Sequence, residues 1–404
     1  MSAAFDTQVL FEPEDPNGAV IMPVYRTSTY ILDPEHPFDS RWLYARHGNP
    51  NTDMLEEKLA TLEGGKHGYC FASGMAALSH LCLALLSPGD HIIAVSDIYA
   101  GTYKFFTQIL QPKFGMEIDF VDISVCAGED WSLLEAQLTE STRMILVESP
   151  SNPLTKLIDL GRLTALAHAR GIHVCIDSSY NSPALLQPIL QFGVDSVFHS
   201  LSKYIAGHST EVGGAVILKE DGPVLPDGQT LSAALRQYQH FIGGFLAPEV
   251  AWQINQGIKT LPLRMQKHSS NAMRVATWLE AHPHVEQVLY PGLASHPQHE
   301  MACLHFQHGF GGMMAVTLKG GKPAAMAFLK ALKKPFHYGV SLGGVESLVA
   351  HPASIHYAIR SAEENETYGL MGGTLRLSIG IEDPEDLIAA LETAFKAISS
   401  AACS

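Results

Sequence analysis

Short apolar runs recur through much of this 404-residue chain, and helical segments separate most of them. Such runs are typical of buried strands. Strands that alternate with helices form parallel sheets, because each crossover returns the chain to the same edge of the sheet. The chain is therefore predicted to be an α/β protein with a mostly parallel, doubly wound sheet. The predicted strands are His91–Val95, Glu117–Val121, Met144–Glu148, His173–Asp177, Ser196–Ser200 and Gly214–Leu218.

A single lysine, Lys203, follows the apolar run Val194–Phe198 and lies between the hydroxyls of Ser200 and Ser202. An isolated lysine after a strand is usually a solvated surface residue. At the end of a buried strand, however, it is partly desolvated, which favours the neutral amine that forms imines. The hydroxyls beside it can bind a phosphate, and pyridoxal 5'-phosphate (PLP) is the cofactor that requires both features. We therefore predict that Lys203 binds PLP covalently.

A carboxylate ends the preceding predicted strand. Asp177 follows the apolar run Ile172–Ile176, and 203 − 177 = 26 residues separate it from Lys203. That length suffices for a parallel crossover through a helix or loop over Ser182–Phe192, so both residues would reach the carboxyl edge of one sheet. A strand-end turn would also explain Asp177 alone. Together with Lys203, it is predicted to pair with the pyridinium nitrogen of PLP.

The segment Phe71–Ala77 joins a strand-like run, Tyr69–Phe71, to a helix rich in alanine and leucine. Small residues at a helix start let an anion approach free backbone N–H groups. This segment is therefore a candidate site for the phosphate of the same cofactor, although a tightly packed helix start would show the same pattern.

Composition excludes several classes of partner. There are 26 Lys and Arg against 41 Asp and Glu, a net charge of −15, which argues against nucleic acid and anionic membranes. The first ten residues lack a secretion signal, and no apolar run approaches a membrane span. Six scattered cysteines without a CxxC pair indicate reduced core residues, so we expect a cytoplasmic protein.

The chain is expected to divide into three parts. Residues 1–47 are rich in Pro, Asp and aromatic residues without a sustained period, which is typical of an extended arm that contacts a neighbouring subunit. Residues 48–247 contain the alternating pattern, with a first helix expected to start near Asp53. Residues 248–404 are expected to form a smaller α+β domain. Its predicted elements are a helix over Glu249–Arg264, strands at Gly311–Leu318 and Leu375–Ile381, and a terminal helix over Pro384–Ile398.

A series of ordered motifs resembles the Cys/Met-metabolism PLP-dependent enzymes, which include cystathionine β- and γ-lyases, cystathionine γ-synthase, methionine γ-lyase and O-acetylhomoserine sulfhydrylase. The resemblance covers nearly the whole chain from about Gly18. It implies a fold-type-I PLP-dependent transferase. The motifs are Tyr44–Pro50, Ala72–Met75, Tyr99–Thr102, Glu148–Pro153, Ser200–Gly207, Ser341–Ser347 and Leu375–Ser378.

The resemblance implies a role for each matching residue. Lys203 would carry PLP and move the Cα proton, and Tyr99 would stack on the ring and help deprotonate the incoming amine. Arg376 would clamp the substrate carboxylate. The remaining roles would be phosphate binding by Gly74, Met75, Ser200 and Ser202, pairing of the ring nitrogen by Asp177, orientation of the ring oxygen by Asn152, support of Arg376 by Asn152 and Ser341, and completion of a neighbour's phosphate site by Tyr44 and Arg46. A homotetramer built from two catalytic dimers is expected.

Several positions depart from the family pattern. Ser178 replaces a common Asn, Ser202 a common Thr and His240 a common Asn. Gly101 stands where methionine γ-lyases typically carry Cys. Leu43 and Val340 stand where many cystathionine γ-lyases carry acidic residues, so the distal ammonium of cystathionine loses an expected partner.

One cluster could imitate a metal site. His296, His299, Cys303 and His305 recur near helical spacing but do not match a recognised zinc arrangement. We expect no metal there and interpret the cluster as exposed histidines on a helix.

The expected reaction is β-elimination of cystathionine to homocysteine, pyruvate and ammonia. β-Elimination needs one proton abstraction, whereas γ-chemistry needs two. The acidic residues typical of γ-lyases are replaced by Leu43 and Val340, and the Cys typical of methionine γ-lyases is replaced by Gly101. Cystathionine γ-lyase, cystathionine γ-synthase and methionine γ-lyase activities remain alternatives. A scaffold without catalysis is disfavoured, because the catalytic positions keep competent side chains.

Overall fold

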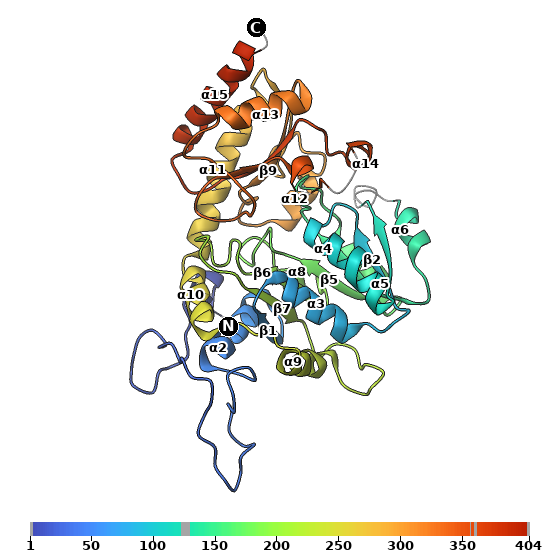
Figure 1. The fold of residues 1–404 in the computed structure, drawn as a ribbon, viewed down its shortest axis with the longest axis vertical. Coiled ribbons are helices and arrows are strands. Elements are labelled where there is room, and N and C mark those ends of the chain that lie inside the picture. The colour runs from blue at the N-terminus through green and yellow to red at the C-terminus, as the bar shows by residue number, and fades with distance from the viewer. Residues whose placement is uncertain (1–2, 123–129, 356, 359–361, 402–404) are drawn as a thin grey trace.

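The chain forms two sheets, each covered by helices, in a computed structural model that describes residues 3–122, 130–355, 357–358 and 362–401. Figure 1 shows the larger sheet with its helices in the lower half of the view and the smaller sheet above it. The long helix α11 (Leu261–Glu280) connects the two regions. Within the described residues, no helix is both long and apolar enough to cross a membrane.

The larger sheet has seven strands in the order β1-β7-β6-β5-β4-β2-β3. The five strands from β6 to β3 are parallel, whereas β7 pairs antiparallel with both β6 and β1. The mostly parallel, doubly wound sheet predicted from the sequence is thus confirmed. The strands are β1 (His67–Phe71), β2 (His91–Val95), β3 (Glu117–Val121), β4 (Thr142–Glu148), β5 (His173–Asp177), β6 (Ser196–Ser200) and β7 (Gly214–Leu218).

The central strands are buried on both faces. Every residue of β2, β5 and β7 is buried, and because successive side chains point to opposite faces, helices must cover both. Helix α3 packs on β6 and β7, and α7 packs on β5. The helices of this region are α2 (Pro50–Glu63), α3 (Gly74–Leu85), α4 (Ala100–Phe105), α5 (Gln111–Phe114), α6 (Ser132–Gln137), α7 (Leu160–His168), α8 (Pro188–Phe192) and α9 (Leu231–Phe241), with a π-helical turn η1 (Phe106–Leu110) between α4 and α5.

The smaller sheet has five strands in the order β10-β11-β12-β9-β8 and is antiparallel except for the pair β10–β11. Helices α11, α13 and α15 pack together or against it around a separate apolar core. Its strands are β8 (Val285–Leu289), β9 (Met313–Leu318), β10 (His337–Tyr338), β11 (Leu348–Ala350) and β12 (Thr374–Ser378). The helices are α10 (Pro248–Ile258), α12 (His299–His305), α13 (Gly321–Ala331), α14 (Ala362–Thr367) and α15 (Pro384–Ala401), with a 3₁₀ turn η3 at Pro352–Ser354.

Two predicted helices have wrong boundaries, at places where an N-cap residue or a proline begins a helix. Helix α2 begins at Pro50 rather than near Asp53, because Asn49 caps it by accepting the Asn51 N–H at 2.9 Å. The helix predicted over Glu249–Arg264 is two helices, since α10 ends at Ile258 and α11 starts at Leu261. Pro262 lacks an N–H and favours the first turn of a new helix.

The N-terminal segment contains one short helix, α1 (Phe5–Gln8), and otherwise extends away from the sheets, as the blue loops in Figure 1 show. Long-range hydrogen bonds tie it down, among them those from Tyr25 N to Asn51 Oδ1 and from Trp252 Nε1 to the Met22 carbonyl, both at 2.8 Å. Its apolar side chains Ile31 and Phe38 are 100% and 85% exposed. The segment therefore has little core of its own.

Three of the six cysteines lie in the core, as expected. Cys70, Cys82 and Cys175 are buried free thiols, and burial raises the pKa of each. Cys303 is a free thiol but is exposed, so the expectation of a core position is wrong there. Cys126 and Cys403 lie outside the described residues.

Candidate active site

A cavity of about 520 Å³ opens at the carboxyl ends of β4, β5 and β6. Parallel pairing aligns the last residues of β4 and β5, Glu148 and Asp177, so both carboxyl groups reach the same edge. Ten of the twelve residues predicted for the site line this cavity: Gly74, Met75, Tyr99, Asn152, Asp177, Ser200, Ser202, Lys203, Ser341 and Arg376.

Lys203 lies just beyond the end of β6, where its backbone N–H donates to the Ser200 carbonyl at 3.2 Å. Its Nζ donates to Ser341 Oγ at 2.7 Å, across 138 residues of sequence. Desolvation, reinforced by the positive charge of Arg376, lowers the pKa of Lys203 to about 8. A substantial fraction of the amine is therefore neutral and nucleophilic near neutral pH.

Asp177 is a buried carboxylate without an ion pair among the described residues. Its Oδ1 accepts the Ser179 N–H at 3.0 Å. Burial raises the pKa of Asp177, and burial together with the charge of Asp177 raises the pKa of Glu148 well above its ordinary value. Hydrogen bonds from Ser179 and, after them, the charge of Lys203 partly offset the effect of burial on the pKa of Asp177. A proton taken up by the pair is therefore placed preferentially on Glu148, which leaves Asp177 to meet a cation from the cavity.

The start of α3 forms one wall of the cavity. Ser73 caps the helix by accepting the Ala76 N–H at 3.1 Å. A Cβ atom at Gly74 would lie 3.0 Å from Ser200 Cβ, so only glycine allows the helix start to approach β6 this closely. Ser202 Oγ accepts the Gly213 N–H at 3.1 Å. The helix N-terminus and these hydroxyls together make an anion-binding corner.

Arg376, on β12, reaches the cavity from the smaller sheet and is buried there. Its Nη1 donates to Asn152 Oδ1 at 3.3 Å, and its Nη2 donates to the Ser341 carbonyl at 2.6 Å. Its Nε has no hydrogen-bond partner. Burial lowers the pKa of Arg376 to about 10. A buried guanidinium with a free donor is a ready site for a carboxylate ligand.

Tyr99 stands at the N-terminus of α4 and is 40% exposed. Its backbone N–H donates to Glu148 Oε2 at 2.9 Å, so the buried Glu148 side chain positions it. A Cβ atom at Gly101 would lie 2.4 Å from Tyr99 Cε1. Gly101 therefore leaves room for the Tyr99 ring in this conformation.

Tyr44 and Arg46 do not line the cavity of their own chain. Arg46 Nε donates to the His240 carbonyl at 2.8 Å, and its guanidinium lies 5.3 Å from the Tyr44 ring centroid. His240 in turn bonds the His47 carbonyl through Nε2 at 2.9 Å and stacks on the His47 ring. This arrangement gives His240, an unusual residue at its position, a structural role beside the N-terminal segment.

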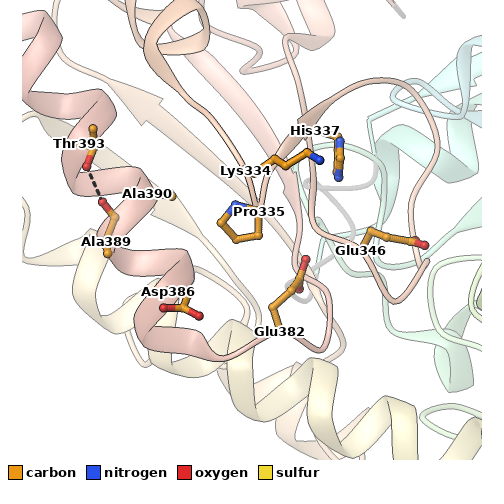
Figure 2. Close-up of a pocket in the computed structure, with 9 residues that line it drawn as sticks. All are labelled: Lys334, Pro335, His337, Glu346, Glu382, Asp386, Ala389, Ala390 and Thr393. Carbon is orange, nitrogen blue, oxygen red and sulfur yellow. Dashed lines mark hydrogen bonds between the residues drawn. The ribbon is translucent and has the colours of Figure 1, made fainter.

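A second hollow of about 690 Å³ lies between α15 and the segments that carry Pro335, Glu346 and Glu382 (Figure 2). Figure 2 shows Glu346 and Glu382 on separate segments beside it. Glu382 accepts both the backbone N–H and the hydroxyl of Ser347, at 2.7 and 2.9 Å. Its carboxylate therefore anchors the loop that ends in Ser347, and none of the predicted site residues lines this hollow.

The histidine cluster was interpreted wrongly. His296 and His305 are each 4% exposed rather than solvated, and His296 Nε2 bonds Thr155 Oγ1 at 3.2 Å. Burial lowers the pKa of both, which keeps them neutral in the core. In the described residues no group of three or more His, Cys, Asp or Glu side chains is arranged to hold a metal ion.

Sequence reasoning missed several cavity residues, among them Glu148, Ser179, Tyr180 and Glu211. Glu148 could have been found, because it ends a predicted strand next to the strand that ends in Asp177. Glu211 lies in an irregular segment and had no such signal.

Comparison with known proteins agrees with the fold. Residues 6–396 match the family described as Cys/Met metabolism PLP-dependent enzyme. Cystathionine beta-lyase from Coxiella burnetii is 38% identical over 392 residues, which cover 96% of this chain and 97% of that protein. Cystathionine gamma-lyase from Bacillus subtilis is 38% identical and covers 93% of this chain and 94% of that protein.

A solved structure of cystathionine gamma synthase from Xanthomonas oryzae pv. oryzae in complex with cystathionine superposes with a TM-score of 0.90, at 36% identity, over 99% of this chain and 100% of that one. The fold is therefore that of a fold-type-I PLP-dependent enzyme. The chain belongs to the Cys/Met-metabolism family of PLP-dependent enzymes, and its relatives include both lyases and a synthase.

The residues present fit the cofactor. The buried, cation-free carboxylate of Asp177 suits a protonated ring nitrogen, and the glycine-lined corner at Gly74 admits a phosphate. Lys203 supplies an amine of lowered pKa in the same cavity.

Proposed function

We propose that this enzyme is a carbon–sulfur lyase that cleaves cystathionine by β-elimination to homocysteine, pyruvate and ammonia. The observation that carries the proposal is the pairing in one cavity of a desolvated amine, Lys203, with a buried guanidinium, Arg376, that keeps a free donor. The Lys203 amine can move a proton at Cα, and the Arg376 guanidinium can hold the α-carboxylate of an amino acid.

Bound PLP stores the electron pair that remains when the Cα proton is removed. Lys203 would hold the cofactor through Nζ until a substrate amine displaces it, and the released amine would then take this proton. Ser341 Oγ, at 2.7 Å, would orient that amine. Asp177 would hold the ring nitrogen in its protonated form. Gly74, Met75, Ser200 and Ser202, which line the cavity, would hold the phosphate.

Arg376 orients the substrate, with Asn152 Oδ1 and the Ser341 carbonyl fixing its guanidinium plane. Tyr99, which lines the same cavity, would stack on the cofactor ring and help deprotonate the incoming amine. Two relatives support an amino-acid substrate: the Xanthomonas synthase structure is a complex with cystathionine, and the Lactobacillus plantarum cystathionine gamma-lyase structure is a complex with L-serine.

The smaller number of proton abstractions favours β- over γ-elimination. Loss of the Cα proton and expulsion of a thiolate from Cβ requires one proton abstraction, whereas expulsion from Cγ requires a second one at Cβ. Val340, which lines the cavity, is apolar and supplies no carboxylate to the distal end of cystathionine. Relatives of equal similarity are named beta-lyase and gamma-lyase, so γ-chemistry is the alternative to test.

We also propose a homotetramer built from two catalytic dimers. Tyr44 and Arg46 lie outside their own cavity, on a segment with exposed apolar side chains such as Val20 (91%) and Ile31 (100%). In an assembly this segment would bury those side chains and bring Arg46 to a neighbour's phosphate.

Product analysis tests the reaction. Purified enzyme with PLP is incubated with cystathionine, and the keto acid and thiol formed are identified. Pyruvate with homocysteine is expected. 2-Oxobutyrate with cysteine, or faster turnover of an O-acylhomoserine with cysteine, would overturn β-elimination. Lys203→Ala serves as the control, because it should remove turnover with every substrate.

A further inference from the structure

The rim of the cavity carries a carboxylate, Glu211, to which the proposed function assigns no role. Glu211 lines the cavity together with Val212 and Val340. Val212 is 63% and Val340 58% exposed, whereas Arg376 is 3% exposed. The two valines thus mark the mouth of the cavity, and Arg376 lies on its floor.

Hydrogen bonds fix the segment that carries Glu211. On one side, the Gly213 N–H donates to Ser202 Oγ at 3.1 Å. On the other, Ser209 Oγ donates to Glu346 Oε2 at 3.0 Å, and the Val345 N–H donates to the Gly207 carbonyl at 3.0 Å. Glu211 therefore lies on a defined wall between the segment of Lys203 and the loop of Ser341.

Glu211 has no hydrogen bond or ion pair to any of the described residues. Partial burial and the neighbouring charge of Glu249 raise its pKa. Glu249 itself is paired with Arg26 at 3.4 Å. The Glu211 side chain is thus a carboxylate without a cation, in a place where a ligand cation would be favourable.

The other carboxylates that line the cavity already have assigned roles. Glu148 accepts the Tyr99 N–H, and Asp177 lies at the cofactor end. Because Val340, which lines the rim, is apolar, it cannot bind a positive group at the distal end of a substrate. Of the cavity-lining residues, Glu211 is the carboxylate left for that purpose.

We propose that Glu211 is a specificity-determining residue that binds the distal ammonium group of a substrate whose α-carboxylate is held by Arg376. This inference rests on the proposed function. The cavity then has a cationic floor and an anionic rim, which selects amino acids with a second amino-acid head, such as cystathionine. Substrates with a neutral tail gain nothing from Glu211, and those with an anionic acyl tail are repelled.

The decisive variant is Glu211→Gln, which removes the charge but keeps the shape. Its kcat/KM for cystathionine should fall about fivefold, mainly through KM, as expected for a half-exposed charge pair. Its kcat/KM for cysteine, which lacks a distal ammonium group, should stay within about twofold. Glu249→Gln is the matched control, since it removes a nearby charge outside the cavity, and it should change neither value by more than about twofold.

A binding measurement isolates the same contact without turnover. L-Lysine and L-norleucine differ only in the distal ammonium group, and each is used as a competitive inhibitor. Wild-type enzyme should bind lysine several-fold more tightly than norleucine, and Glu211→Gln should lose this preference. The visible absorbance of bound PLP should be the same in both proteins, which shows that the variant is folded and loaded.

Three results would overturn the inference: equal losses for cystathionine and cysteine in Glu211→Gln, a lysine preference that is absent from wild type or survives in the variant, or an equal effect of Glu249→Gln. The proposed function is tested independently, by identifying the keto acid that cystathionine yields. If cystathionine yields 2-oxobutyrate, β-elimination is wrong, while a selective loss in Glu211→Gln would still support the ammonium contact.

Discussion

Covalent capture of PLP by the cofactor-free protein should accelerate as the pH rises, because only the neutral form of Lys203 reacts. Desolvation lowers the pKa of Lys203 from 10.5 to about 8, with Arg376 adding to the effect. At pH 7 about 9% of such an amine is neutral, against about 0.03% of an ordinary lysine. The cavity therefore increases the reactive fraction about 300-fold.

The sign and shape of the pH profile follow from this value. Deprotonation produces the reactive form, so the rate rises with pH and levels off above the pKa. Between about pH 7 and pH 9 the neutral fraction grows about tenfold for Lys203, but about a hundredfold for an unshifted lysine. The assay mixes stripped protein with PLP and follows the visible absorbance of the protein-bound cofactor.

A short peptide with a single lysine, reacted under the same conditions, corrects for the titration of PLP itself. The ratio of protein to peptide rates should fall about tenfold between about pH 7 and pH 9. Arg376→Gln removes a positive charge beside Lys203, so its profile should shift to higher pH. A constant ratio of protein to peptide rates would refute the argument that burial lowers the pKa of Lys203.

Other substitutions test separate parts of the structure. Asp177→Asn should lower kcat about a hundredfold in steady-state assays, because a neutral amide does not hold the ring nitrogen protonated. Arg376→Lys should raise KM for cystathionine about tenfold, since lysine lacks the planar fork. Arg46→Ala should lose PLP faster on dialysis with an unchanged thermal midpoint. Leu78→Ala, at a fully buried position in α3, should lower the free energy of unfolding by about 2–5 kcal/mol in urea titrations. The opposite outcome in any of these would contradict the role assigned to that residue.

Local pattern was sufficient for most of the larger sheet. The ranges predicted for β2, β3, β5, β6 and β7 coincide with the strands observed. Each is a short run bounded by polar or turn-forming residues, and most are strongly apolar, so burial and local preference point to the same structure. Strand-end reasoning also brought Asp177 and Lys203 to one edge, because parallel strands end together.

Local pattern failed where a distant contact decided the outcome. His296 and His305 look like solvated residues in a polar segment, but packing against distant segments buries them. Glu148 was not predicted as a cavity residue, and its effect on Tyr99 depends on a hydrogen bond across 49 residues. Glu211 gained significance only because its segment lies between two loops that are far apart in sequence.

The amino-acid sequence by itself determined the alternating architecture, the lysine and the carboxylate that reach one edge of the sheet, and the family. These depend on periodicity and on motifs within a few residues, which local physics controls. Only the tertiary structure decided which groups share the cavity and how burial shifts their pKa values. The contact of Arg376 with Asn152 spans 224 residues and that of Lys203 with Ser341 spans 138, and the lowered pKa of Lys203 follows from burial by both sheets. Desolvation depends on the atoms that surround a group, and their positions are set by the folded chain.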